Sequence, residues 1–180
     1  MKLMIASDVH GCTDGCTKML NAYRREKAEK LVLLGDLLYH GPRNGVPADY
    51  DPAKVIDLLN SVGPELLCIR GNCDSEVDQM VLDFPIMAEF AVLFADGRRV
   101  YLTHGHILNE DNPPKVKEGD IVLSGHTHVP VCHEKDGVLY MNPGSTSIPK
   151  GGSTYSYMTL DAEKAEWKDM DGNVYMAHRF

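Results

Sequence analysis

The strongest constraint on the fold is a pattern in the first third of the sequence, where short apolar segments alternate with helix-forming ones. Residues 2–7, 31–34 and 65–69 are the apolar segments, each short enough for a buried strand. Good helix formers fill the chain from about residue 14 to residue 30, and Asp51-Pro52 starts a second helix. This order predicts right-handed crossovers and a parallel sheet.

The remainder of the sequence has the pattern of antiparallel hairpins. Asp96-Gly97 and Asp136-Gly137 are strong signals for tight hairpin turns. The strands predicted on either side of these turns are residues 90–94, 98–103, 131–134 and 138–141. No linker separates the two halves of the chain, and 180 residues are enough to bury a core. We therefore expect one α/β domain over residues 1–180, with two packed sheets and helices on the outside.

The composition argues against several classes of protein. The formal net charge is −8 and no run of Lys or Arg occurs, which disfavours nucleic-acid binding because that binding needs cations that neutralise phosphates. No segment is apolar over the length of a membrane span, and Asp8 interrupts the apolar start too early for a signal peptide. The five cysteines form no CxxC pair, which fits a reducing compartment. We expect a cytoplasmic protein without a membrane or nucleic-acid partner.

Side chains able to hold a metal follow five of the apolar segments. The candidate ligands are Asp8, His10, Asp36, Asn72, His104, His126 and His128. In open α/β sheets, sites form beyond the carboxyl ends of strands, so we expect these loops to converge. The pairs Asp8/His10 and His126/His128 are spaced i, i+2, which in extended backbone places both side chains on one face.

The chemistry of this set indicates two metal ions. Two carboxylates, one amide oxygen and four imidazoles suit Mn, Fe, Zn, Co or Ni better than Mg or Ca. Seven ligands are too many for one ion with an open position, but they suit two ions that share a carboxylate. Each fragment alone has a simpler interpretation, such as a turn or helix cap for an Asp after a strand, or a surface pair for His126 and His128. All five fragments together, each at a strand end, favour the metal site.

These motifs resemble those of the calcineurin-like metallophosphoesterase family and occur in family order. They are Asp8-Val9-His10-Gly11, Gly35-Asp36, Gly71-Asn72-Cys73-Asp74, Thr103-His104-Gly105-His106 and Gly125-His126-Thr127-His128. Residues 38–44, 70–80, 142–145 and 149–152 extend the resemblance to the YfcE-type phosphodiesterases within that family.

The resemblance implies an αββα sandwich of two mixed β-sheets flanked by helices, with a dinuclear metal centre at one edge. Asp36 would bridge the two ions, and Mn is the metal expected at both positions. One ion would be held with Asp8, His10 and His128, and the other with Asn72, His104 and His126. The resemblance also implies a homo-oligomer, a dimer or tetramer.

The activity that the resemblance implies is hydrolysis of a phosphodiester bond in a small molecule, with a bridging hydroxide attacking phosphorus. Asp36, Asn72 and His104 would be the catalytic residues. Many family members have a His after the motif Asn, where it can protonate the leaving oxygen, but this chain has Cys73. A neutral thiol is a poor substitute for an imidazolium. We therefore expect a preference for esters with good leaving groups, or protonation of the leaving group through water.

Further residues near these motifs are candidates for binding substrate or supporting the ligands. His40, Arg43 and Cys73 are the candidate substrate-binding residues, and Arg43 could pair with a phosphate oxygen. A solvated loop is the simpler interpretation of His40 and Arg43. His106 is either a support for a neighbouring ligand or only a loop residue, and Asp74, with no histidine to orient, is expected to shape its loop.

Three alternative functions stay open. The same fold serves as a protein-interaction scaffold in the retromer subunit, whose catalytic pattern is incomplete, whereas all seven ligand positions are filled here. A phosphomonoesterase or phosphoprotein phosphatase is the second alternative, although such phosphatases are larger and carry His at the position of Cys73. A nuclease is the third, disfavoured by the negative charge and the lack of a basic groove.

Overall fold

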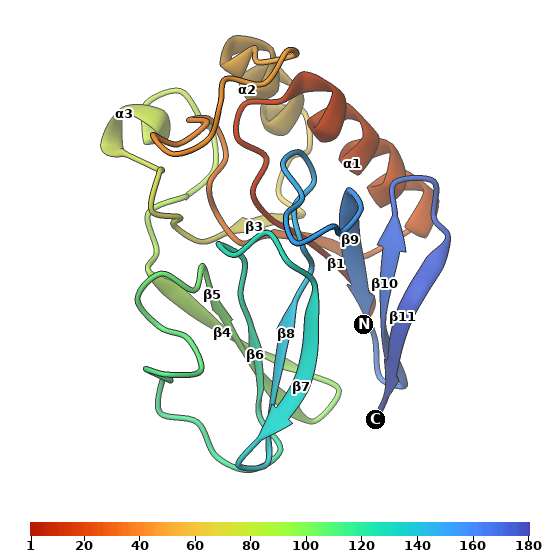
Figure 1. Ribbon diagram of the computed structural model, residues 1–180. Helices are drawn as coiled ribbons and strands as arrows, with labels where there is room; N and C mark the ends of the chain where they lie inside the picture. Colours follow the sequence, from red (N-terminus) through yellow and green to blue (C-terminus); the bar gives the residue numbers. More distant parts are fainter.

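The computed structural model describes residues 1–180, which form two mixed β-sheets packed against each other (Figure 1). The first sheet has the strand order β11-β10-β9-β1-β2-β3 and the second has the order β4-β5-β6-β8-β7. The strands of the first sheet are β1 (Leu3–Ala6), β2 (Lys30–Leu33), β3 (Leu66–Cys68), β9 (Ser156–Leu160), β10 (Lys164–Asp169) and β11 (Val174–Arg179). Those of the second are β4 (Phe90–Ala95), β5 (Arg98–Thr103), β6 (Ile121–Leu123), β7 (Val131–Lys135) and β8 (Val138–Asn142). The two mixed sheets expected from the sequence are confirmed.

Parallel strands form the centre of each sheet. β1, β2 and β3 are parallel neighbours, as the alternation of apolar and helical segments predicts. β5, β6 and β8 are parallel neighbours in the second sheet. Both predicted hairpins form, and Asp96 and Asp136 take the positive φ values of 51° and 52° that tight hairpin turns require. The carboxyl ends of the parallel strands carry the loops in which all seven candidate ligands lie.

The helices largely follow the sequence signals. α1 (Thr13–Glu26) ends before the expected residue 30, because Lys27 adopts a left-handed conformation with φ of 50° and β2 begins soon after it. α2 (Pro52–Asn60) begins as predicted, with the Asp51 carboxylate accepting a hydrogen bond from the Lys54 N–H at 3.1 Å. α3 (Glu76–Gln79) was not predicted; a reciprocal capping box between Ser75 and Asp78 holds it.

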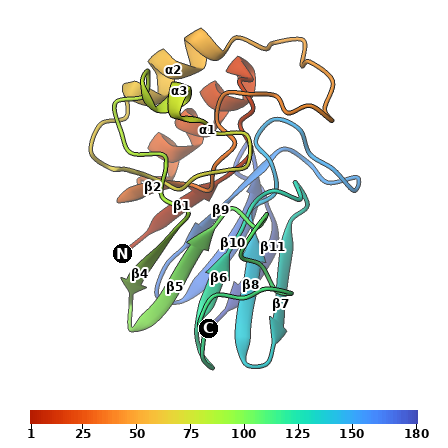
Figure 2. The same cartoon turned by 90° about the vertical axis from the view of Figure 1, so that its left-hand side faces the viewer.

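All three helices lie on the same side of the sandwich (Figures 1 and 2). α1 and α2 bury Met19, Leu20, Val55 and Leu59 in one core cluster with residues of β1 and β2. A second cluster lies between the sheets and contains Trp167. The outer face of the second sheet carries no helix. A third cluster lies on that face, formed by Tyr101, Val122, Val138 and Tyr140, and Val116 packs against it. The Tyr101 hydroxyl donates to the Lys115 carbonyl at 2.7 Å. A loop therefore covers the face on which an αββα sandwich would carry its second layer of helices.

A buried hydrogen bond connects the two sheets close to the candidate ligands, and a second one continues it to a ligand loop. Trp167 Nε1 on β10 donates to the carbonyl of Asn142 on β8 at 2.6 Å. Asn142 Nδ2 donates in turn to the Gly125 carbonyl at 2.7 Å, which fixes the loop that carries His126 and His128. The loop of the second sheet is thus held in place relative to the first. None of the helices combines the length and the apolar character that crossing a bilayer would require.

Candidate metal centre

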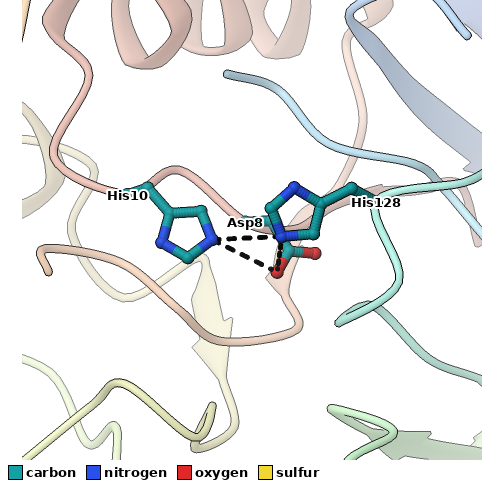
Figure 3. A group of neighbouring side chains, drawn as sticks. All are labelled: Asp8, His10 and His128. Carbon is teal, nitrogen blue, oxygen red and sulfur yellow. Dashed lines mark hydrogen bonds and ion pairs between the residues drawn. The ribbon is translucent and has the colours of Figure 1, made fainter. Parts of the chain in front are cut away.

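Asp8, His10 and His128 form the first half of the candidate site (Figure 3). Asp8 and His10 follow β1 in one sheet, whereas His128 follows β6 in the other. Asp8 Oδ1 lies 3.4 Å from His128 Nε2 and 3.7 Å from His10 Nε2, and the two Nε2 atoms are 3.2 Å apart. All three residues are buried. Three potential ligand atoms from two sheets therefore converge on one point.

Asp36 joins this group to a second one. Asp36 Oδ2 lies 3.7 Å from His10 Nε2 and 3.4 Å from His104 Nε2. His104 Nε2 in turn lies 3.1 Å from Asn72 Oδ1. The backbone N–H of Cys73 donates to the other oxygen, Asp36 Oδ1, at 2.8 Å. Asp36 thus occupies the central position that a shared ligand needs.

Backbone carbonyls set the orientation of three imidazoles. The Nδ1 atoms of His10, His104 and His128 face the carbonyl oxygens of Tyr39, Leu34 and Ile148 at 2.7, 2.6 and 2.6 Å. Because a carbonyl only accepts, each Nδ1 carries a proton, and Nε2 is the ring atom that faces the cluster and is left to bind a metal. This is how proteins orient histidines toward metal ions.

The resulting arrangement needs a cation. The Nε2 lone pairs of His10 and His128 face each other across 3.2 Å. Asp8 Oδ1 is fully buried and has no hydrogen-bond donor, a large cost in free energy for a buried charged oxygen. A divalent ion between these atoms would satisfy all of them, so the donor set fits a metal.

His126 lies beside the second group rather than inside it. Its ring packs edge-on against the ring of His104, with centroids 5.1 Å apart, and its backbone N–H donates to Asp8 Oδ2 at 3.1 Å. His106, whose role the sequence left open, packs edge-on against His104 at 5.3 Å. The structure therefore brings six of the seven candidate ligands into direct contact and places the ring of His126 next to them.

The backbone conformation of the ligand loops differs from the extended one assumed from the sequence. Asp8, His10, Asp36, His126 and His128 have φ values of 59°, 51°, 57°, 67° and 60°. The extended backbone expected for the pairs Asp8/His10 and His126/His128 is therefore wrong. Left-handed conformations cost roughly 1–3 kcal/mol each in non-glycine residues and cluster at functional sites. Here hydrogen bonds between loops hold them, such as Asp8 N–H to Gly35 O at 3.1 Å and His10 N–H to Asp36 O at 2.9 Å.

Gly71 and Asp74 hold the loop of Asp36 against the loop of Asn72. A Cβ on Gly71 would lie 2.1 Å from Asp36 Oδ1 and 2.3 Å from Asp36 N, so only glycine fits. The buried Asp74 carboxylate accepts from the backbone N–H groups of Asp36, Leu37 and Gly71 at 2.8, 2.9 and 2.7 Å. The expectation that Asp74 shapes its loop is confirmed.

The electrostatics of the site also favour a cation. Burial alone would raise the pKa of Asp36, but His104 and the Cys73 N–H lower it well below its ordinary value. Burial alone would lower the pKa of His104, but Asp36 and Asp8 raise it to about 9. The carboxylates therefore stay ionised, and without a metal a proton takes its place on His104.

A surface cavity opens onto this cluster and includes two of the three candidate substrate-binding residues. Arg43 and Cys73 line it together with His10, Asp36 and Asn72. His40 is not among the lining residues; its ring packs on Tyr39 and edge-on against Tyr50. Lys150 does line the cavity, a position that the sequence motif 149–152 contained but to which no role was given.

Comparisons with known proteins agree with this geometry. The calcineurin-like phosphoesterase superfamily domain matches residues 1–165. The chain belongs to the calcineurin-like phosphoesterase family. It is 47% identical to phosphodiesterase YfcE of Escherichia coli K12 over 161 residues, which covers 89% of this chain and 88% of that protein.

Solved structures show the same relationship. The E. coli phosphoesterase Yfce superposes with a TM-score of 0.96 at 43% identity and covers 99% of both chains. Vacuolar protein sorting 29 of Cryptosporidium parvum superposes with a TM-score of 0.66 at 19% identity, covering 99% of this chain and 97% of its own, and shares the fold alone. The family, the two mixed sheets of the expected fold class and the expectation of a metallophosphoesterase are confirmed.

Proposed function

We propose that this phosphoesterase hydrolyses a phosphodiester bond in a small molecule, using two divalent metal ions bridged by Asp36. The observation that carries the proposal is the position of Asp36 Oδ2, 3.7 Å from His10 Nε2 in one group and 3.4 Å from His104 Nε2 in the other. The naming of the E. coli relative as a phosphodiesterase supports the reaction class.

The ligand assignment follows the two groups of side chains. Asp8, His10, Asp36 and His128 would hold one ion, and Asp36, Asn72, His104 and His126 the other. Nitrogen and oxygen donors in this proportion suit Mn, with Fe, Zn, Co or Ni as alternatives. Two such ions would polarise the phosphoryl oxygens, activate water for attack and neutralise charge in an in-line displacement.

The protein's own residues orient the substrate and control access. Asn72 and His104, 3.1 Å apart, would lie against the phosphoryl group. Arg43 lines the cavity over the cluster, where its guanidinium could bind an anionic group of the substrate. Burial and the neighbouring Asp36 raise the pKa of Cys73 to about 12, so its thiol stays neutral. The leaving oxygen then takes its proton from water, and the enzyme prefers esters with good leaving groups.

The complete ligand set supports an enzyme over an interaction scaffold. We further propose that the whole chain acts as one domain in the cytoplasm, as a homo-oligomer, with no nucleic-acid or membrane partner. The net charge of −8 supports the exclusion of nucleic acid.

Activity on two matched esters tests the proposal. Manganese-loaded enzyme should hydrolyse bis-p-nitrophenyl phosphate, a diester, much faster than p-nitrophenyl phosphate, a monoester with the same leaving group. Asp36→Asn should lower kcat by about 100-fold or more, as loss of a metal bridge does. Asp57→Asn, an exposed carboxylate on α2, is the matched control and should keep full activity. A wild-type enzyme that is inactive on the diester, or an unaffected Asp36→Asn variant, would refute the proposal.

A further inference from the structure

Two cavities adjoin the candidate metal centre, and His126 lines both of them. The first is the one that contains His10, Asp36, Arg43 and Lys150. The second contains His106, Glu110, Asp111 and His133. A phosphodiester has two ester arms, so a phosphorus atom placed beside His126 would direct its arms toward different cavities.

The first cavity carries two cations that have no anionic partner. Arg43 and Lys150 are exposed, and neither forms a salt bridge or a side-chain hydrogen bond. They come from different loops, one between β2 and α2 and the other between β8 and β9. The only carboxylate that lines this cavity is Asp36, which already faces His10 and His104.

The second cavity has the opposite character. Two carboxylates line it: Glu110, which lies 2.6 Å from His133 Nε2, and Asp111, which lies 3.8 Å from Lys135 Nζ. These partners offset only part of the negative charge. No unpaired Lys or Arg lines it. An anionic group would therefore be repelled there and attracted to the cavity of Arg43 and Lys150.

The scissile phosphodiester alone does not account for two further cations. A phosphodiester carries one negative charge, and two divalent ions held by Asp8 and Asp36 already supply the positive charge that it needs. Arg43 and Lys150 are thus available for a second anionic group on the substrate. Guanidinium and ammonium groups both bind carboxylates and phosphates.

From this charge asymmetry we infer that Arg43 and Lys150 are specificity-determining residues for phosphodiesters that carry a second anionic group, a carboxylate or a phosphate, on one arm. The inference rests on the proposed function and specifies its substrate class. The anionic arm lies in the cavity of Arg43 and Lys150, and the other arm lies toward Glu110 and His133.

A matched pair of substrates isolates the effect of the second charge. p-Nitrophenyl 3-carboxypropyl phosphate and p-nitrophenyl 3-carbamoylpropyl phosphate share the leaving group and differ only by a carboxylate in place of an amide. The manganese-loaded wild-type enzyme should have the higher kcat/KM on the carboxylate ester. Arg43→Gln and Lys150→Gln should each reduce the ratio of the two kcat/KM values about three- to tenfold, the effect of one partly exposed charge pair. Lys54→Gln removes an exposed lysine that lines neither cavity and should keep the ratio.

Binding provides a readout that does not depend on turnover. The corresponding p-nitrobenzylphosphonate esters, in which a methylene replaces the leaving oxygen, are bound but not hydrolysed at that position. By calorimetry, the wild-type enzyme should bind the carboxylate compound with a lower Kd than the amide compound, by the same factor as the ratio of the kcat/KM values. A wild-type enzyme without preference for the carboxylate compound, or a ratio unchanged in both variants, would overturn the inference. If neither phosphate ester is hydrolysed, the proposed function fails, and the Kd ratio still decides the inference. If both are hydrolysed with equal efficiency and the analogues bind equally, only the inference fails.

Discussion

His10 Nε2 and His128 Nε2 lie 3.2 Å apart, while the Nδ1 atoms of both rings face backbone carbonyls at 2.7 and 2.6 Å. The carbonyls place the protons on Nδ1, so the two Nε2 lone pairs point at each other. Asp8 Oδ1, which accepts no hydrogen bond, lies beside them. Only a cation makes this arrangement favourable. A pair of imidazoles contributed by two different sheets therefore indicates a metal more directly than the sequence motif does.

Metal binding should release protons at neutral pH. The pKa of His104 is raised to about 9 by Asp36 and Asp8, so at pH 7 this ring is protonated until a metal displaces the proton. About one proton should be released per chain from His104, and metal affinity should rise as the pH increases toward 9. Calorimetry of manganese binding in buffers of different ionisation enthalpy measures the number directly. Affinity that does not change between pH 6 and pH 9, with no proton release, would contradict this account.

The contact between Gly71 and Asp36 should tolerate no side chain. A Cβ at position 71 would lie 2.3 Å from Asp36 N, a backbone atom that cannot move aside. We expect Gly71→Ala to reduce the free energy of unfolding by about 2–4 kcal/mol and to weaken manganese binding. Urea denaturation and metal titration measure the two effects. Gly45→Ala is the control, since a Cβ added there would have no atom within 4 Å apart from those of its chain neighbours, and the change should be nearly neutral. Equal behaviour of the two variants would show that the close approach does not matter.

Glu26 should make stability depend on pH. Its carboxylate accepts hydrogen bonds from Lys2, Lys168 and Tyr157 at 2.7 to 3.0 Å. Burial would raise its pKa, but these partners lower it to about 2 from an ordinary value of 4.5. A lowered folded-state pKa means that the stabilisation is present above pH 4.5 and is lost as the pH falls toward 2.

Glu26→Gln should therefore lower the free energy of unfolding by on the order of 2 kcal/mol at pH 7, and by much less near pH 2. Urea denaturation across this range gives the difference. Glu163→Gln, which alters an exposed carboxylate without a salt-bridge partner, should show no such dependence. If the free energies of unfolding of wild type and Glu26→Gln differed by the same amount at all pH values, the ion-pair network would be contradicted.

Cys73→His should change how the rate depends on the leaving group. Cys73 Sγ belongs to a potential ligand group with His10 and Asp36, so an imidazole there would reach the reacting phosphate. It could protonate the leaving oxygen, which should raise kcat/KM about 100-fold for esters with poor leaving groups and much less for nitrophenyl esters. Plots of log kcat/KM against leaving-group pKa should be shallower for the variant. Identical slopes would mean that the thiol does not limit the reaction.

Much of the fold could be predicted because local signals and packing agree. The alternation of apolar and helical segments predicted the parallel strands, and Asp96-Gly97 and Asp136-Gly137 predicted both hairpins. The sequence does not indicate the early end of α1, because Lys27 adopts a left-handed conformation that a lysine does not favour. The missing helical layer depends on the loop at Lys115 and Val116, whose contacts with Tyr101 and its neighbours are tertiary.

The residues of the candidate site could be predicted from their positions after strands, but their geometry could not. Positive φ at Asp8, His10, Asp36, His126 and His128 is maintained by hydrogen bonds between loops distant in sequence. The place of Lys150 in the cavity wall depends likewise on a loop that returns from the second sheet to the first. The local sequence around Lys150 does not indicate that this exposed lysine lies beside the candidate metal centre.

Electron paramagnetic resonance of the manganese-loaded protein, combined with metal analysis, tests the central claim most directly. Two ions that share Asp36 should give a stoichiometry of about two manganese ions per chain and the spectrum of an exchange-coupled pair. Asp36→Asn should abolish the coupling, whereas Asp57→Asn should preserve it. A fully loaded wild-type protein that binds one ion per chain, or whose ions are magnetically isolated, would contradict the dinuclear centre.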